Sequence, residues 1–285
     1  MNDLVVLPIA ETRIRESNMY EFLKALGAPK WDTDATDDSS YLIEVAGRLC
    51  YKAFGTDLNK NLTKVREGNE EYVKNIIKQQ HGSVFEHASV TFGFLNVSRI
   101  FTHELVRHRA GTAFSQESQR FVRLDDFQVY IPDLDQPLRD LYDIVDGTDS
   151  PDEKEEFIKN KQQEFFEAFH DVNNHVKETL QSLIASWELD RSDVPFAIKK
   201  QLTSAMRRLV PGGVNTNIIV TANHRTWRHI INMRCSPGAE IEIFKVMNKV
   251  AEHLKNLYPA IYSDMEKKID IETSISRYVI ENPKI

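Results

Sequence analysis

The chain has 285 residues, of which 41% are hydrophobic and 28% are charged, and its formal net charge is −7. This length and apolar fraction exclude a disordered chain and suffice for one large domain or two small ones. The acidic balance argues against a general nucleic-acid or membrane-surface binder, and the 2 cysteines exclude a disulfide framework and favour a reducing cytoplasm.

The first part of the chain predicts a mixture of strands and helices. Residues 1–16 are expected to form an opening strand and turn, and their apolar run is too short for a signal peptide or a membrane span. Apolar residues at helical spacing predict a capped helix over 38–50 and a second helix over 69–80. Alternating residues predict a strand over 90–94, and Ser98 is expected to cap a helix that runs to His108.

The second part predicts longer helices. Residues 121–131 favour a strand, and the acidic, turn-rich stretch 132–152 favours a loop or insertion. One long helix or two consecutive ones are expected over 157–189, with an apolar stripe typical of a core or a subunit interface. A helix over 194–210 and a buried strand over 216–222 follow.

The C-terminal part is expected to contain helices at 225–233 and 239–265, followed by an amphiphilic tail over the last 20 residues. Helices and non-contiguous strands without regular βαβ alternation predict an α+β fold.

Arginine is unevenly distributed along the chain. Ten of the 17 arginines fall within residues 99–123 and 207–234, and neither window contains a lysine. Arginine is preferred where planar, bidentate contact with phosphate or carboxylate is needed. The clustering favours a pocket for a small polyanion such as a nucleotide. The alternative is that these arginines pair with acidic residues elsewhere in the fold.

Other chemistries find little support in the sequence. His103 and His108 flank a segment similar to a zinc-protease motif, but their i, i+5 spacing would not place both on one helix face, so no metal site is expected. Cys50 falls on the apolar face of a predicted helix and is expected in the core. Cys235 lies near a turn and could be exposed, but neither cysteine has the setting of an activated thiol.

Three polar segments stand out together: residues 81–87, 98–121 and 223–234. On the predicted helix, Glu104, Arg107 and His108 would be neighbours at i, i+3 and i+4. The following loop, 111–118, offers backbone N–H groups and hydroxyls to a phosphate. A helix C-terminus with favourable cations would also explain Arg107 to Arg109, but it would leave the second arginine cluster unexplained.

The segment Arg107-His108-Arg109, followed by Ser118 and then by Gln119-Arg120 and an aromatic residue, resembles the signature of the flavin-dependent thymidylate synthases. Further blocks resemble the same family in the same order: residues 46–51, 81–87, 207–211 and 223–234. The resemblance covers about residues 40–125 and 195–265.

Three features depart from the family pattern. Eight residues separate Arg109 from Ser118, where the usual spacing is seven, and the extra residue is expected in the turn 110–112. Phe121 replaces the usual tyrosine. The stretch 130–190 is longer than in compact members of the family.

The resemblance implies a single domain over residues 1–285, with an insertion at about 130–190 and a C-terminal tail at about 266–285. It implies a central, mostly antiparallel sheet wrapped by long helices. It also implies a cytoplasmic homotetramer in which residues from several subunits build each active site, with no nucleic-acid or membrane partner.

The reaction implied by the resemblance is the methylation of dUMP to dTMP. Methylenetetrahydrofolate would supply the carbon and leave as tetrahydrofolate, NADPH would reduce a bound FAD, and no protein nucleophile would be needed. The protein would supply position and electrostatics.

The resemblance also implies roles for individual residues. The expected catalytic residues are Arg107, Ser118 and Arg234, with Arg107 at the nucleotide–flavin junction and Arg234 on the uracil edge. Residues expected to bind dUMP are Glu104, Arg107, Gln116, Ser118, Arg120, Arg207 and Arg234. Residues expected to hold FAD are Ser83, Glu86, Arg107, His108, Arg109, Asn223, Arg225 and His229. His81 is expected to contact folate or nucleotide.

Two alternatives stay open. A related flavin enzyme could transfer a one-carbon unit to dUMP and finish as a hydroxymethylase. A non-catalytic nucleotide- or RNA-binding homologue could keep the anion pocket alone. The mass of the product separates the first from a methylating enzyme, and bound FAD counts against the second.

Overall fold

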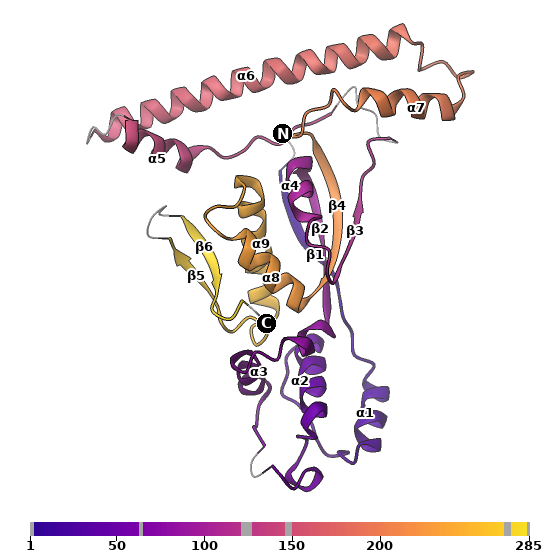
Figure 1. Ribbon diagram of the computed structural model, residues 1–285, viewed down its shortest axis with the longest axis vertical. Helices are drawn as coiled ribbons and strands as arrows, with labels where there is room; N and C mark the ends of the chain where they lie inside the picture. Colours follow the sequence, from indigo (N-terminus) through magenta and orange to yellow (C-terminus); the bar gives the residue numbers. More distant parts are fainter. Residues whose placement is uncertain (1–2, 63–64, 121–126, 146–149, 271–274, 284–285) are drawn as a thin grey trace. The chain divides into compact units, whose positions relative to one another are not determined.

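The computed structural model (Figure 1) describes residues 3–62, 65–120, 127–145, 150–270 and 275–283. The chain divides into two compact units. Unit 1 comprises Met1–Val5, Phe94–Leu105 and Ser115–Ile218, and unit 2 comprises Val6–Gly93, Val106–Phe114 and Ile219–Ile285. Strands and helices occur in both units, so the predicted α+β class is confirmed.

Four strands form one sheet in the order β1-β2-β4-β3; they are β1 (Val5–Glu11), β2 (Ser89–Ser98), β3 (Thr112–Gln116) and β4 (Asn215–Asn223). Every second side chain of β4 is buried, as expected for a strand with one face in the core. The strands predicted at the start of the chain, at 90–94 and at 216–222 are therefore confirmed.

The loop predicted over 111–118 is wrong for most of its length, because Thr112–Gln116 is strand β3. The segment is short and polar, so it lacks the apolar alternation that signals a strand. Its backbone is stabilised by pairing at the edge of the sheet, and beyond the strand the Glu117 N–H still donates to the Asn217 carbonyl at 3.1 Å.

Unit 2 contains the predicted N-terminal helices α2 (Asp38–Tyr51) and α3 (Asn69–Lys78), and an additional helix α1 (Glu16–Ala25) that the sequence pattern did not predict. Asp37 caps α2, because its Oδ1 accepts from the Ser40 N–H at 2.7 Å. Only Leu23 of α1 is buried, which explains the weak amphipathic signal of that helix.

A buried ion pair lies within α2. Arg48 donates to Glu44 through Nε at 2.8 Å, and the two side chains are 3% and 2% exposed. The other carboxylate oxygen of Glu44 accepts from Thr33 Oγ1 at 2.6 Å and from Asn69 Nδ2 at 2.8 Å. The Arg48 guanidinium also lies 4.3 Å from the ring centroid of Tyr72. Every charge in this cluster therefore has close partners, as burial requires.

The C-terminal part of unit 2 consists of α8 (His224–Arg234), α9 (Ile241–Leu257) and an antiparallel hairpin of β5 (Met265–Ile269) and β6 (Ser276–Ile280). Strand β6 packs against both helices (Figure 1). The helix predicted over 225–233 is confirmed, whereas the helix predicted over 239–265 ends at Leu257. The predicted tail is this hairpin together with residues 281–283.

Unit 1 begins its helical part with α4 (Arg99–Leu105). The predicted cap is confirmed, because Ser98 Oγ accepts from the Phe101 N–H at 3.0 Å. The helix ends at Leu105 instead of His108, so Glu104, Arg107 and His108 do not share a helix face. The strand predicted over 121–131 falls partly outside the described residues. In the remainder, Val129 makes an isolated bridge to Val214.

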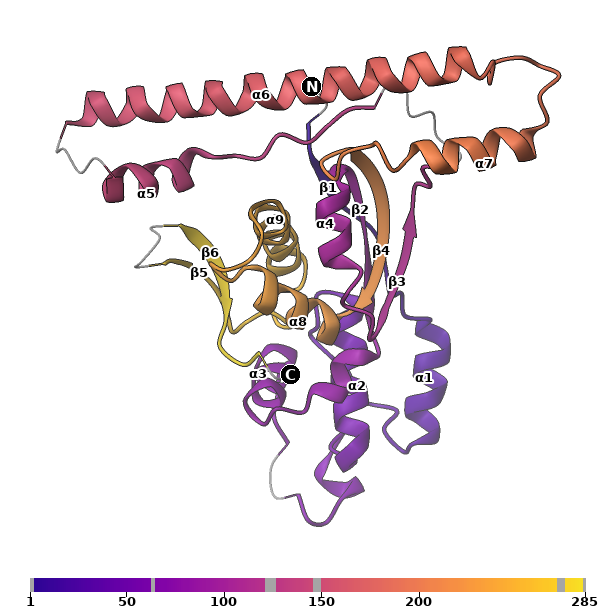
Figure 2. The same cartoon turned by 45° about the horizontal axis from the view of Figure 1, so that its top comes forward.

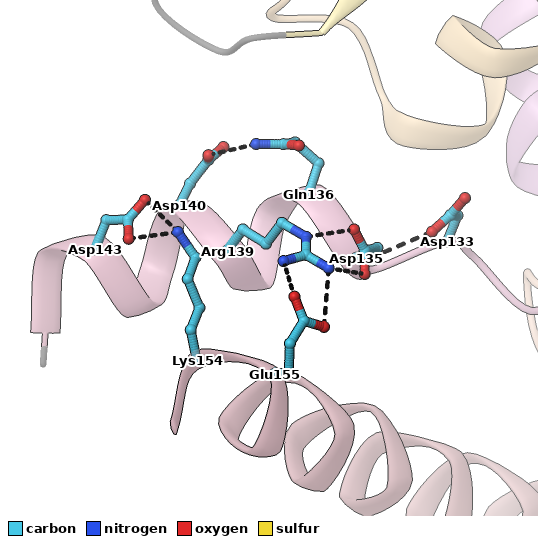
Figure 3. A network of polar contacts seen from close by, with 8 residues as sticks. All are labelled: Asp133, Asp135, Gln136, Arg139, Asp140, Asp143, Lys154 and Glu155. Carbon is cyan, nitrogen blue, oxygen red and sulfur yellow. Dashed lines mark hydrogen bonds and ion pairs between the residues drawn. The ribbon is translucent and has the colours of Figure 1, made fainter. Parts of the chain in front are cut away.

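The loop alternative predicted over 132–152 is wrong for residues 135–145, which form helix α5 (Asp135–Val145). Figure 3 shows how α5 is tied to the start of α6 (Pro151–Ser186): Arg139 donates to Glu155 at 2.5 and 3.1 Å and to Asp135 of its own helix at 2.7 Å. Lys154 of α6 also donates to Asp143 of α5 at 2.6 Å.

Helix α6 is a single helix of 36 residues, which confirms the long helix predicted here. It runs beside α5 at its start and beside α7 (Phe196–Met206) at its end (Figure 2). The end of α6 and α7 share an apolar cluster centred on Leu180, Leu189 and Met206. Within the described part of the chain, no helix has both the length and the apolar character to cross a membrane.

Candidate active site

A cavity of about 1180 Å³ lies in unit 2. Its wall comes from four places that are far apart in the sequence: the segment η2 (Gly82–Glu86), the turn that precedes β3, α8 with its N-cap, and Pro283 near the C-terminus. Thirteen residues line it: Glu86, Arg107, His108, Arg109, Ala110, Gly111, Asn223, Arg225, Thr226, His229, Asn232, Met233 and Pro283. All the residues that the sequence predicts to hold FAD, except Ser83, are in this set.

The N-terminus of α8 forms part of the wall. Asn223 caps the helix, since its Oδ1 accepts from the Thr226 N–H at 2.8 Å. Thr226 Oγ1 in turn donates to the Ala110 carbonyl at 3.0 Å, which ties the turn before β3 to α8. The unpaired N–H groups and the dipole of a helix N-terminus favour an anion.

Gly111 is required at this junction. Its φ is +71°, which is the left-handed region, and an added Cβ would lie 2.4 Å from Thr226 Oγ1 and 2.8 Å from Asn223 Nδ2. Glycine is the residue that allows the backbone to approach the helix cap so closely. The turn in which the sequence predicts an extra residue is thus the turn that contacts the start of α8.

Charge dominates the cavity wall. Three arginines and two histidines face one carboxylate, that of Glu86, so the lining is cationic overall. Arg225 Nη1 pairs with Glu86 Oε1, which orients this guanidinium on the wall although both side chains remain partly exposed. Such a lining fits a ligand with phosphate groups.

A second polar contact fixes the histidines. Arg234 Nε donates to His108 Nε2 at 2.9 Å, so this ring nitrogen of His108 is an acceptor. His229 packs edge to face against His108, with ring centroids 5.6 Å apart. Arg234, which the sequence predicts at the uracil edge, therefore lies directly against a residue of the cavity wall.

Two further residues of unit 2 stand apart from this lining. Ser83 is exposed on η2 and is not part of the cavity wall. His81, the expected folate or nucleotide contact, stacks on Tyr51, with ring centroids 5.9 Å apart and an angle of 21° between the planes.

Unit 1 has its own pocket of about 290 Å³, and its lining includes Glu104, one of the residues expected to bind dUMP. The lining is Arg99, Ile100, His103, Glu104, Gln119, Val210, Pro211 and Gly212. Burial, and secondly the charge of Arg207, lower the pKa of the Arg99 guanidinium below its ordinary value. A bound anion would relieve the repulsion between these two like charges.

Arg99 was not among the predicted site residues. Its place in the first arginine window was the available signal, but its burial and its proximity to Arg207 follow only from the fold.

The other residues of unit 1 that are expected to bind dUMP lie on and after β3 and after α7. Gln116 Nε2 donates to Thr102 Oγ1 at 3.0 Å and reaches Thr216 Oγ1 at 3.4 Å. Ser118 Oγ accepts from the Arg120 N–H at 3.3 Å, and the side chains of Arg120 and Arg207 are exposed. Phe121, the residue in place of tyrosine, lies outside the described residues.

The expected locations of the two cysteines are wrong in both cases. Cys50 is exposed and not in the core, because it lies on the outer side of α2 near its end. Cys235 is buried, and burial raises the pKa of its thiol to about 12. A thiol so hard to ionise is a poor nucleophile.

Comparisons with known proteins identify the family of this chain. The sequence pattern of the family described as "Thymidylate synthase complementing protein" matches residues 33–260. The flavin-dependent thymidylate synthase of Mycobacterium avium (strain 104) is 35% identical over 260 residues, which cover 90% of this chain and 91% of that protein. The enzyme of the same name from Mycobacterium tuberculosis (strain ATCC 25618 / H37Rv) is 34% identical over 259 residues, with the same coverage.

A solved structure shares the fold. The UMP/dUMP methylase PolB from Streptomyces cacaoi, bound with 5-Br UMP, aligns over 92% of each chain with a TM-score of 0.60 and 18% sequence identity. The match of the family pattern over most of the chain and the identity to the mycobacterial proteins show more than the fold. The chain is an enzyme that belongs to the thymidylate synthase complementing protein family, the flavin-dependent thymidylate synthases.

Proposed function

We propose that this enzyme converts dUMP to dTMP, with FAD in the cavity of unit 2, methylenetetrahydrofolate as the carbon donor and NADPH as the reductant. One observation carries the proposal: the residues expected to hold FAD come from three distant segments, and all but Ser83 line one cavity. Membership of the family supports the reaction, and the resemblance to that family supports dUMP as the substrate.

The cavity suits a dinucleotide. Its volume of about 1180 Å³ exceeds the ~300–1,000 Å³ that is usual for small ligands. Arg109 and Arg225, with the N-terminus of α8, would hold the pyrophosphate, which is a doubly charged anion. The side chains of Asn223 and Asn232 offer amide groups to the polar edges of the rings. FAD, when bound there, would supply the hydride that completes the methyl group.

Arg107 and Arg234 would act on the pyrimidine of dUMP. Arg107, on the cavity wall, would stabilise negative charge on the pyrimidine carbonyl as the ring accepts the carbon unit. Arg234 would favour the enolate-like form of the uracil edge. Its hydrogen bond to His108 would fix the direction of the guanidinium, so that little reorganisation is needed during the reaction.

Unit 1 would contribute contacts to the nucleotide. Glu104, Gln116, Ser118, Arg120 and Arg207 are proposed to bind dUMP, with the arginines on its phosphate. Arg99 joins this group because it is half-buried, faces the charge of Arg207 and lines the pocket that holds Glu104. Since both units carry such residues, we propose that residues 1–285 act as one functional domain.

We further propose a cytoplasmic homotetramer with shared sites. The exposed apolar side chains of α6, among them Phe165 and Val172, support a subunit interface on this helix. Mass photometry of the purified protein tests the number of subunits, and a monomer at micromolar concentration contradicts the proposal.

The reaction is tested with the purified full chain. Its visible absorption spectrum is recorded, dUMP, methylenetetrahydrofolate and NADPH are added, and the mass of the nucleotide product is measured. A flavin spectrum with a dTMP product supports the proposal, and Arg107→Ala should then abolish turnover. Arg139→Ala is the matched control, because the side chain of Arg139 pairs with Asp135 and Glu155 of the α5–α6 hairpin.

Two outcomes favour the alternatives. Flavin with a hydroxymethylated product keeps the site and changes the reaction, which the altered spacing between Arg109 and Ser118 leaves open. Absence of flavin binding, even with added FAD, favours a nucleotide-binding homologue without catalysis.

A further inference from the structure

The C-terminal segment contributes to the wall of the cavity. Pro283 lines it, although the family pattern matches only residues 33–260. The remaining lining residues precede position 234 and fall within the matched range, whereas Pro283 lies beyond it. The contacts that hold this segment therefore determine the position of Pro283 on the cavity wall.

A buried ionic cluster anchors the segment. Arg228 of α8 makes two hydrogen bonds of 2.8 Å to the two carboxylate oxygens of Asp264, and the side chains are 0% and 9% exposed. Asp264 Oδ2 also accepts from the backbone N–H and the side-chain amide of Asn282, both at 3.1 Å. Arg228 Nη2 donates to the Asn282 carbonyl at 3.3 Å. Asn282, which precedes Pro283, is thus held through its backbone N–H, its carbonyl and its side-chain amide.

The charge of this cluster is balanced. Burial alone would raise the pKa of the Asp264 carboxyl, but the hydrogen bonds and charge of Arg228, with the contacts of Asn282, lower it below its ordinary value. Asp264 is therefore ionised at neutral pH. Loss of either member of the Arg228–Asp264 pair would leave a buried charge uncompensated, so the pair keeps this geometry.

The same helix carries the anchor and the cavity wall. Arg225, His229 and Asn232 of α8 line the cavity, and Arg228 lies on the buried side of that helix. Strand β6, which leads to Asn282, packs against α8. The position of Pro283 relative to the cavity is consequently set by a helix and a strand that are packed together.

We propose that Pro283, held through Asn282 by Arg228 and Asp264, forms a fixed part of the cavity wall that slows the release of its dinucleotide. The inference rests on the proposed function, because it takes FAD as the ligand. Pro283 is a positioning residue here: its rigid ring covers the ligand and takes no part in the reaction.

The test measures flavin release, not turnover. FAD-loaded protein is diluted rapidly and the return of flavin fluorescence gives the dissociation rate. A chain that ends at Asn282 removes the wall and keeps the anchor, so we expect release about threefold to tenfold faster with an unchanged unfolding midpoint. Pro283→Gly should show the same direction in the full-length chain, and this variant isolates the ring of Pro283.

Asn282→Ala loosens the anchor and should also speed release. Ile269→Ser is the matched control, because this residue of the same hairpin is 72% exposed and belongs to neither the cavity lining nor the anchor. Release rates equal to the wild type in the chain ending at Asn282 and in Pro283→Gly would overturn the inference. Failure of the wild-type chain to bind FAD would instead contradict the proposed function.

Discussion

Two ion-pair networks in this chain have similar geometry and opposite surroundings. Glu44 and Arg48 of α2 are 2% and 3% exposed, with a closest N–O distance of 2.6 Å. Arg139 of α5 and Glu155 of α6 are 29% and 61% exposed, with a closest N–O distance of 2.5 Å (Figure 3). The two networks therefore differ in the burial of their side chains and not in their contact distances.

The pKa of Arg139 illustrates the difference. The hydrogen bonds that Arg139 donates to Glu155 and Asp135 raise the pKa of this guanidinium above its usual range. Water surrounds the network, however, and screens the charges, so the raised pKa adds little to stability. In α2 both side chains are buried, so a charge that loses its partner is not hydrated by water. The free energy of unfolding therefore depends strongly on each of these contacts.

The largest effect is expected from breaking the buried network. Arg48→Met leaves the Glu44 carboxylate buried without its cation, and such a loss costs about 3–5 kcal/mol. Urea unfolding followed by circular dichroism measures the free energy of unfolding. Glu44→Gln together with Arg48→Met should recover part of the loss, since no buried charge is then left unpaired. A single variant as stable as the wild type would contradict the comparison.

The buried side chain of His224 extends the comparison to the dependence of stability on pH. Burial, and secondly the charge of Arg228, lower the pKa of His224 to about 3, and its ring is packed between Tyr258 and Tyr262. Between the ordinary value of 6.5 and about 3, the unfolded chain binds a proton at this residue and the folded chain does not. Stability should therefore fall as the pH falls below 6.5, by about 1.4 kcal/mol per pH unit.

Unfolding at a series of pH values from 7 to 5 checks this slope. His224→Phe should remove this residue's contribution to it. His170→Phe on α6 is the control, because His170 is exposed and should leave the slope unchanged. Equal slopes in the wild type and in His224→Phe would show that other groups govern the acid sensitivity.

An exposed ion pair can still matter where a ligand binds. Glu86 and Arg225 are about as exposed as ordinary surface pairs, but both line the cavity. Arg225→Gln should weaken FAD binding about tenfold, as expected for loss of a charged hydrogen bond, and should leave the unfolding midpoint nearly unchanged. Equilibrium titration with FAD measures the affinity, and an unchanged Kd would remove Arg225 from the proposed flavin site.

The smallest effect is expected at the exposed network. Arg139→Met, the same substitution as at position 48, should leave the urea midpoint unchanged within error, because its charges are screened. For the same reason, added salt should change the urea midpoint of the wild type and of Arg139→Met by the same amount. A loss comparable to that of Arg48→Met would show that the α5–α6 contact contributes far more than its exposure suggests.

Much of the site could be predicted from the sequence, and the reasons are local. Asn223 stands directly before an amphipathic helix, so both the cap and the helix could be inferred, and the residues of 107–109 lie within a recognisable signature. The spacing of Glu44 and Arg48 is equally visible. Their burial could not be predicted, because the covering ring of Tyr72 comes from another helix.

Other elements were missed for physical reasons. Helix α5 carries apolar residues at helical spacing, but acidic residues and a proline gave the segment the composition of a loop. Strand β3 gains its backbone partners from the edge of the sheet, which local pattern does not encode. Arg228 and Asp264 hold the segment that carries Pro283 against the cavity. These two residues are far apart in the sequence, so their contact could not be inferred from a local pattern.

Gly111 has a consequence for how this family can vary. The turn that holds it contains the expected extra residue, and a side chain at this position would collide with Asn223 and Thr226. An additional residue in this turn would therefore be compatible with the fold only if glycine occupied this position. Relatives with the same turn length should keep glycine there, whereas relatives with the shorter turn are released from that restriction.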